Sequence, residues 1–97
     1  MATVRHVERT IKAIEHFDAR LHYEQPGRAV GKDVRGDREN VPSYPYTKAA
    51  SGDLTVAAWL EKRLERAYPG FTAVVLDGRH TPVHGRMTLA SVRSTYD

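Results

Sequence analysis

The chain has 97 residues, with 15 lysines and arginines, 12 aspartates and glutamates, five histidines and no cysteine. This length holds one modest hydrophobic core, so we expect a single domain over residues 1–97. The lack of cysteine excludes disulfide frameworks and thiol nucleophiles, and the net charge of +3 permits an anionic partner without requiring one. No apolar run approaches the roughly 18 residues of a membrane span, and no export signal is visible, so we predict a cytoplasmic protein that does not enter a membrane.

The first apolar pattern predicts a helix that ends near Asp18. Its apolar residues recur at steps of three or four, which places them on one stripe of a helix: Val4, Val7, Ile11, Ile14 and Phe17. Residues 20–24 then alternate apolar and polar side chains, which is the period of a short strand.

Residues 25–53 hold four of the seven glycines and three of the five prolines, without helical or strand period. A structureless connection of this length is unusual inside a small domain, and it is typically functional or disordered. Its glycine pair, Gly27 and Gly31, resembles a phosphate-binding loop only in part, because the spacing is one residue short and Asp33 stands where a hydroxyl is needed. The Arg-Gly-Asp tripeptide at 35–37 is short enough to recur by chance.

The second half of the chain predicts a helix, a strand and one ambiguous element. Residues 54–67 have helical periodicity, with a cap at Thr55 or Asp53 and a stop at 68–70. The run 71–76 is apolar on both alternating faces, which predicts a strand covered on both sides. We predict a further strand over 83–92, although its apolar residues would also suit a short C-terminal helix.

This element order predicts an α+β fold of two layers. Two helices lie on one face of a small, about three-stranded antiparallel or mixed sheet, with a long irregular loop between the first strand and the second helix. The second face of the sheet then needs a cover, either the segment 41–46 folding back or a second copy of the chain. We favour the fold-back, and therefore a monomer over a homodimer, because Tyr44, Tyr46 and the prolines form a pre-extended apolar strip.

The second helix carries the main functional hypothesis. A helical projection buries Val56, Leu60, Leu64 and Ala67 and gathers four residues on a basic flank: Trp59, Lys62, Arg63 and Arg66. Like charges four residues apart oppose helix stability, so stability alone does not explain this segregation. An aromatic within a basic flank suits phosphate contacts with base stacking, or docking of an acidic protein. The alternative is that Trp59 belongs to the core and the basic residues form an ordinary solvated face. The loop adds four more cations: Arg28, Lys32, Arg35 and Arg38.

Catalytic and metal chemistry find little support. His80 and His84 are spaced like helical metal ligands, but Pro82 between them opposes a helix. We therefore predict no catalytic residue, no metal and no cofactor. The sequence predicts a small non-enzymatic accessory or regulatory binding module, with nucleic acid as the favoured partner. The alternative is a protein-interaction module for an acidic partner, or a homodimer, that uses the same surface or a sheet edge.

Overall fold

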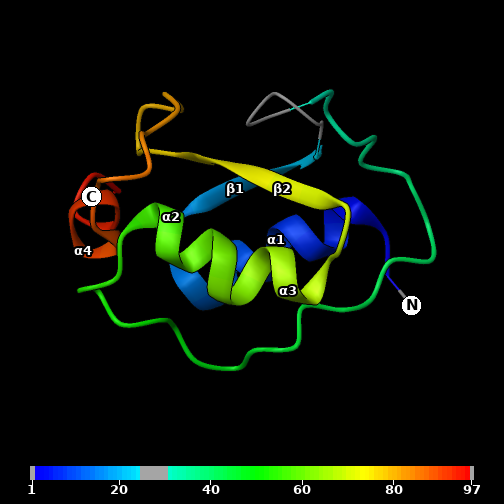
Figure 1. Cartoon of the computed structure of the whole chain (residues 1–97), viewed down its shortest axis with the longest axis horizontal. Coiled ribbons are helices and arrows are strands. Elements are labelled where there is room, and N and C mark those ends of the chain that lie inside the picture. Colours follow the sequence, from blue (N-terminus) through cyan, green and yellow to red (C-terminus); the bar gives the residue numbers. More distant parts are fainter. Residues whose placement is uncertain (1, 25–30, 97) are drawn as a thin grey trace.

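The computed structural model describes residues 2–24 and 31–96 and has the α+β class predicted from the sequence (Figure 1). Arg28, one of the predicted binding residues, lies outside the described residues. The elements in chain order are α1 (Val4–Glu15), β1 (Asp18–Tyr23), α2 (Val56–Trp59), η1 (Leu60–Leu64), α3 (Glu65–Ala67), β2 (Phe71–Leu76) and α4 (Leu89–Arg93).

Helix α1 forms within the predicted apolar stripe but ends at Glu15, three residues before the predicted end near Asp18. Val4, Val7 and Ile11 are buried, and the Thr3 hydroxyl accepts a hydrogen bond from the His6 amide at 3.2 Å, which caps the N-terminus. The helix ends at His16, whose backbone is left-handed with φ 66° and whose N–H donates to the Lys12 carbonyl. This turn reverses the chain direction, and β1 begins two residues later.

The second helix is continuous from α2 through α3 but has π-helical geometry in its middle, η1. Thr55, one of the two predicted caps, caps it by accepting a hydrogen bond from the Ala58 amide at 3.1 Å. The π turn widens the local repeat, so Trp59 and Leu64, five residues apart, are both fully buried. Leu60, predicted to be buried, is only half-buried for the same reason.

Among residues 2–24 and 31–96 the sheet has two antiparallel strands, so the predicted third strand is wrong. The register runs from Asp18 opposite Leu76 to Tyr23 opposite Phe71. In the described part of the chain, each outer edge carries an isolated bridge and a few backbone hydrogen bonds in place of a third strand; the bridges join His22 to Asp33 beside β1 and Leu76 to Pro82 beside β2. A proline has no N–H for a longer ladder, which limits pairing at the β2 edge.

The predicted strand at 83–92 is also wrong, and the alternative of a short helix is correct. Helix α4 occupies Leu89–Arg93, and the Thr88 hydroxyl caps it by accepting a hydrogen bond from the Ser91 amide at 3.2 Å. Leu89 and Val92 are fully buried, so they belong to the helical period and not to strand alternation.

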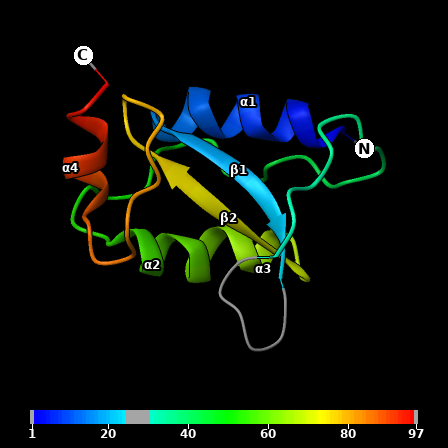
Figure 2. The same cartoon turned by 90° about the horizontal axis from the view of Figure 1, so that it is seen from above.

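Helices α1 and α2–α3 lie on the same side of the sheet (Figures 1 and 2). The connection over 31–53 contains no helix or strand, as predicted, yet it is attached to the fold. The Ala2 and Val4 amides donate to the carbonyls of Val41 and Arg38 at 2.8 and 3.0 Å. Val41 and Tyr44 are buried, but residues 41–53 pass along the helices on the side away from the sheet (Figure 1). The fold-back therefore covers the helices instead of the second face of the sheet.

Candidate functional site

The predicted basic flank of the second helix does not form a stacking surface. Trp59 has no exposed surface and its ring packs edge-on against Phe17, with 5.0 Å between the centroids. A buried ring cannot stack on a nucleobase, so the prediction of Trp59 as a binding residue is wrong and its alternative, a core tryptophan, is correct. Trp59 closes α2 three residues after the buried Val56, so both side chains lie on the same inward side of the helix.

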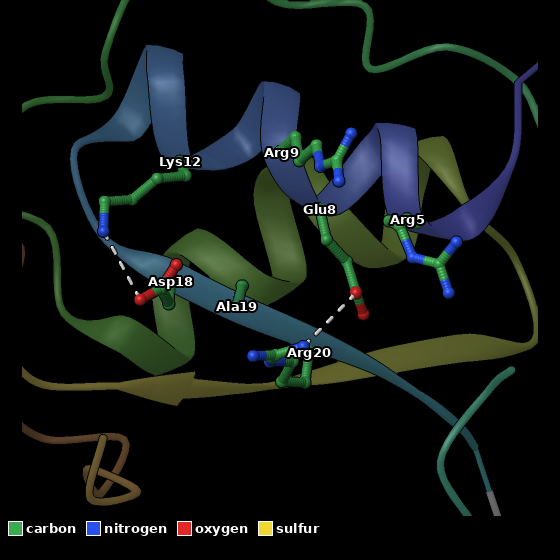
Figure 3. A pocket seen from close by; sticks show the side chains of 7 residues that line it. All are labelled: Arg5, Glu8, Arg9, Lys12, Asp18, Ala19 and Arg20. Atoms are coloured by element: carbon green, nitrogen blue, oxygen red, sulfur yellow. Dashed lines mark hydrogen bonds and ion pairs between the residues drawn. The ribbon is translucent and has the colours of Figure 1, made fainter. Parts of the chain in front are cut away.

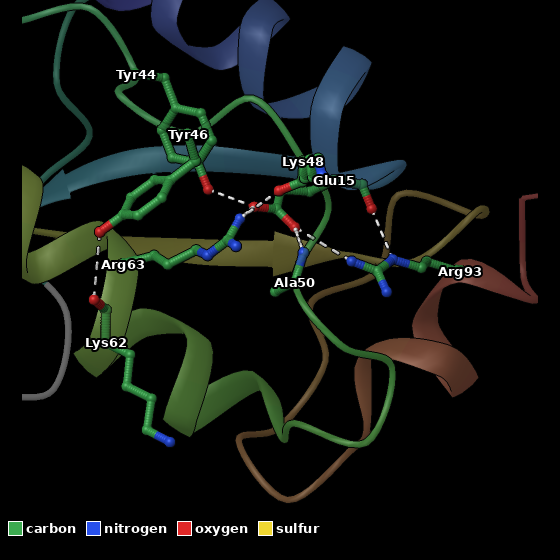
Figure 4. Close-up of polar contacts among 8 residues, drawn as sticks. All are labelled: Glu15, Tyr44, Tyr46, Lys48, Ala50, Lys62, Arg63 and Arg93. Atoms are coloured by element: carbon green, nitrogen blue, oxygen red, sulfur yellow. Dashed lines mark hydrogen bonds and ion pairs between the residues drawn. The ribbon is translucent and has the colours of Figure 1, made fainter.

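Arg63 is also withdrawn from the flank, because it forms an ion pair with Glu15 of α1 (Figure 4). Its Nη1 atom lies 2.6 Å from a Glu15 carboxylate oxygen and donates to the Lys48 carbonyl at 2.7 Å. The guanidinium also lies over the Tyr46 ring, 4.4 Å from its centroid. Of the predicted flank, Lys62 and Arg66 remain exposed.

Glu15 is the centre of a buried polar cluster that sequence reasoning missed. We call it the Glu15 network. Its carboxylate accepts hydrogen bonds from four groups: the Tyr44 hydroxyl at 2.5 Å, the Ala50 amide at 2.9 Å, Arg63 at 2.6 Å and Arg93 at 3.2 Å. The network thus ties α1, the 44–50 segment, the second helix and α4 together (Figure 4). Glu15 lies four residues after Ile11 and continues its buried stripe, which was the available sequence signal.

The hydrogen bonds of the network keep Glu15 ionised despite complete burial. Burial alone raises the pKa of the Glu15 carboxyl, but hydrogen bonds from Tyr44, Ala50 and Arg63 outweigh it and lower this pKa below its ordinary value. The Trp59 indole N–H also contributes to the lower pKa of Glu15, although it has no hydrogen-bond partner of standard geometry among the described residues. Because the carboxylate is fully enclosed, this network is a structural element and cannot reach a substrate.

The other predicted cations, those of the loop, lie near β1. Lys32, Arg35 and Arg38 are exposed. Arg35 pairs with Asp37 at 3.0 Å, and Arg38 donates to the Tyr23 hydroxyl at 2.7 Å. The segment follows the outer edge of β1, where the Lys32 carbonyl accepts a hydrogen bond from the Tyr23 amide at 2.9 Å. These predicted residues therefore share a surface with β1 and not with the second helix.

A groove of about 360 Å³ lies between α1 and this edge of β1 (Figure 3). Its lining is predominantly basic: Arg5, Arg9, Lys12 and Arg20, with Glu8, Asp18 and Ala19. A second groove of about 420 Å³ shares Arg5, Glu8 and Arg20 with the first and extends to residues 33–36. We call the two together the β1 groove. Each volume falls within the roughly 300–1,000 Å³ range of small-molecule sites, so a phosphate group with its attached sugar would fit.

Positive charge exceeds negative charge in the β1 groove. Five basic side chains, Arg5, Arg9, Lys12, Arg20 and Arg35, face three acidic ones, Glu8, Asp18 and Asp33. Within the described part of the chain, Lys12 pairs with Asp18 at 3.4 Å and Arg20 approaches Glu8 at 3.9 Å, whereas Arg5 and Arg9 form no ion pair. In Figure 3 the side chains of Arg5 and Arg9 make no dashed contact with the acids drawn.

Glu8 weakens the positive character of the groove only in part. Burial raises the pKa of its carboxyl above the ordinary value, and this effect outweighs the hydrogen bond from the Leu21 amide and the attraction of Arg20. The carboxylate also accepts that amide bond at 2.8 Å, so one of its oxygens is already occupied. The main role of Glu8 is therefore to accept the hydrogen bond of the Leu21 amide, which faces away from β2.

The groove is held in shape by the 31–38 segment. The Arg5 amide donates to the Gly36 carbonyl at 2.8 Å, and the Arg5 guanidinium lies so close to Gly36 that an added Cβ would stand 3.2 Å from it. The amides at the start of α1 are bonded to Thr3, Gly36 and Arg38, so its N-terminus offers no open anion site. Anion binding in this groove would depend on the side chains.

The sequence predicts the part of the β1 groove that α1 contributes. Arg5, Arg9 and Lys12 recur at steps of four and three, which places them on one side of α1. Their approach to Arg20 and Arg35 depends on how the strand and the loop pack against the helix, and no local pattern encodes that packing.

No protein-family model, curated protein or solved structure matches this chain. Among residues 2–24 and 31–96, no group of three or more histidine, cysteine, aspartate or glutamate side chains is placed to hold a metal ion. None of the helices in these ranges combines the length and the apolar character that a membrane crossing needs.

Proposed function

We propose that this chain is a small, non-enzymatic, cytoplasmic module that binds nucleic acid through the β1 groove. The observation that carries the proposal is the convergence of five cations on one groove, two of which, Arg5 and Arg9, have no acidic partner among the described residues. Arginine presents planar donors that match phosphate oxygens in pairs. A line of such groups favours a polyanion over a single small anion.

The proposal that the chain is not an enzyme rests on the surroundings of two side chains that could act as general bases, His22 and Glu15. His22 has Nε2 3.0 Å from an Asp33 carboxylate oxygen and Nδ1 3.0 Å from the Gly31 carbonyl oxygen. Both ring nitrogens thus face acceptors, and neither is positioned to take a proton from a substrate. Glu15, the other candidate base, is enclosed by its own donors.

A second function, binding of an acidic extended segment of a protein, is favoured by one observation. The N–H and C=O of Leu21 point away from β2, toward Glu8 and Val34. Strand alternation turns the N–H and C=O of Ala19 the same way, into the groove, where no described residue pairs with them. Ala19 is 2% exposed, so a partner strand would form these two hydrogen bonds only after the neighbouring groove side chains moved aside.

The two functions separate in one binding experiment. The purified chain is titrated into labelled oligonucleotides and into a labelled acidic peptide, each at several salt concentrations. Nucleic-acid binding predicts saturable oligonucleotide binding that weakens steeply with salt, because neutralised phosphates release counterions. Binding of the peptide alone would support strand addition and contradict the nucleic-acid proposal.

Charge reversal then locates the surface. The double variant Arg9→Glu with Arg20→Glu should abolish oligonucleotide binding. The control Arg79→Glu with Arg86→Glu changes the net charge equally at two exposed arginines outside the groove, and it should retain most of the binding. A third pair, Lys62→Glu with Arg66→Glu, tests the flank of the second helix that the sequence favoured. Loss of binding only in that third pair would place the interface on the second helix and overturn the groove assignment.

A further inference from the structure

An exposed aromatic side chain lies at the end of β1, two residues beyond Leu21 of the β1 groove. Tyr23 is 39% exposed, and no other large hydrophobic residue in the described part of the chain is exposed. Its ring packs at 36° to that of Phe71, with 5.4 Å between the centroids. The Arg38 guanidinium lies 5.1 Å from the Phe71 centroid and 5.7 Å from that of Tyr23. We call these three side chains the Tyr23 platform.

The platform follows the groove on β1 without lining it. Leu21, two residues before Tyr23 on the strand, lines the groove, and the Arg38 carbonyl accepts the amide of Val4, next to Arg5. Asp18 lines the opposite end of the groove, and at about 3.3 Å per residue the strand runs roughly 17 Å from there to Tyr23. A chain of phosphates that followed β1 from the groove cations would therefore reach the platform within about 17 Å.

We propose that the β1 groove and the Tyr23 platform together bind single-stranded nucleic acid, with phosphates on the groove cations and a base stacked on Tyr23. This inference rests on the proposed function and specifies its ligand. Bases of a duplex are paired and stacked on their neighbours, whereas those of a single strand can stack on an aromatic ring without base-specific contacts. The stacking role expected of the buried Trp59 thus falls to Tyr23.

The platform has the composition that such stacking uses. An aromatic ring contributes a π face, and a neighbouring guanidinium adds cation–π attraction for a base and charge for its phosphate. The hydrogen bond from Arg38 to the Tyr23 hydroxyl, at 2.7 Å, limits the motion of both side chains before a ligand arrives. Lys32, whose carbonyl bonds to the Tyr23 amide, adds an exposed cation beside the platform.

The test compares two single strands with equal numbers of phosphates. Labelled oligodeoxythymidylate and an abasic oligonucleotide of the same length are titrated with the wild-type chain, and binding is followed by fluorescence anisotropy. The wild type should prefer the base-bearing strand by about 5- to 150-fold for one stacked base. Tyr23→Leu, which keeps an apolar cover, should reduce this preference to near one without changing affinity for the abasic strand. Tyr23→Phe should retain most of the preference.

The outcomes separate this inference from the function it rests on. Equal affinity of the wild type for both strands, or tighter binding to a duplex of the same length, would overturn base stacking while leaving groove binding in place. A lack of binding to every oligonucleotide would overturn both. If Tyr23→Leu fails to fold, the comparison of the two strands with the wild type alone still decides the question.

Discussion

The Glu15 network and the β1 groove use the same type of residue in opposite ways. In the network, Arg63 and Arg93 are 20% and 19% exposed and both hold one buried carboxylate. In the groove, Arg20 is 60% exposed and 3.9 Å from its nearest acid, and Arg5 and Arg9 have no ion pair in the described part of the chain. An arginine in a basic cluster is thus informative about binding only when its acidic partners within the fold are known.

The largest effect that this comparison predicts is at Glu15. Glu15→Ala removes the acceptor of two arginines, a tyrosine and an amide, and leaves their donors inside the protein. Loss of one partner of a buried ion pair should lower the free energy of unfolding by about 3–5 kcal/mol, as measured by urea denaturation. The control Glu61→Ala, at an exposed position, should change it by no more than about 0.5 kcal/mol. Similar losses in the two variants would refute a structural role for the network.

A sharper contrast comes from two arginines three residues apart on the same helix. Arg63→Ala removes charged hydrogen bonds to Glu15 and Lys48, and should cost about 1.5–3 kcal/mol of unfolding free energy. Arg66→Ala, at an exposed position, should cost no more than about 0.5 kcal/mol. Equal costs, measured side by side in urea, would mean that the inward assignment of Arg63 is wrong.

The pH dependence of stability should have opposite signs in the two regions. The pKa of Glu15 is lowered in the folded state, so its stabilisation is complete above its ordinary value of 4.5 and is lost as pH falls through the lowered pKa. The pKa of Glu8 is raised, so the folded state binds its proton more tightly and this carboxyl loses stability as pH rises above 4.5.

Urea denaturation at pH 7 and at pH 3 checks these signs. The stability difference between the wild type and Glu15→Gln should shrink at pH 3, because below 4.5 the unfolded chain takes up a proton at Glu15 more readily than the folded chain does. The penalty of Glu8→Gln relative to the wild type should instead be smaller at pH 7 than at pH 3. A Glu15→Gln penalty that grows on acidification would contradict the lowered pKa of Glu15.

Periodicity and capping rules predicted the helices and strands whose pattern lies within a few neighbouring residues. The apolar stripe of α1, the cap at Thr55 and the apolar run of β2 all lie where periodicity and capping place them. The extra strand at 83–92 was wrong because its apolar residues fit two periods, and only the burial of Leu89 and Val92 decides between them. The π turn of η1 was not predictable from a 3.6-residue projection, which placed Leu60 in the core and Trp59 on the flank.

The candidate surface was predictable only in part, for a related reason. Lys32, Arg35 and Arg38 were identified as basic loop residues, and two of the four flank residues, Lys62 and Arg66, are exposed as expected. The pairing of Arg63 with Glu15 spans 48 residues, and no local pattern reports an ion pair between such distant positions. The β1 groove likewise forms only when α1, β1 and the loop pack together.

The salt dependence of oligonucleotide binding tests the central claim most directly, namely that the groove arginines contact phosphates. The logarithm of affinity is measured against the logarithm of salt concentration for the wild type, for Arg9→Ala with Arg20→Ala, and for Arg79→Ala with Arg86→Ala as the matched control. The groove variant should bind more weakly, and its slope should be shallower by about 0.7 for each lost contact with a single strand. The control should keep the wild-type slope. A groove variant with the wild-type slope and affinity would contradict the claim.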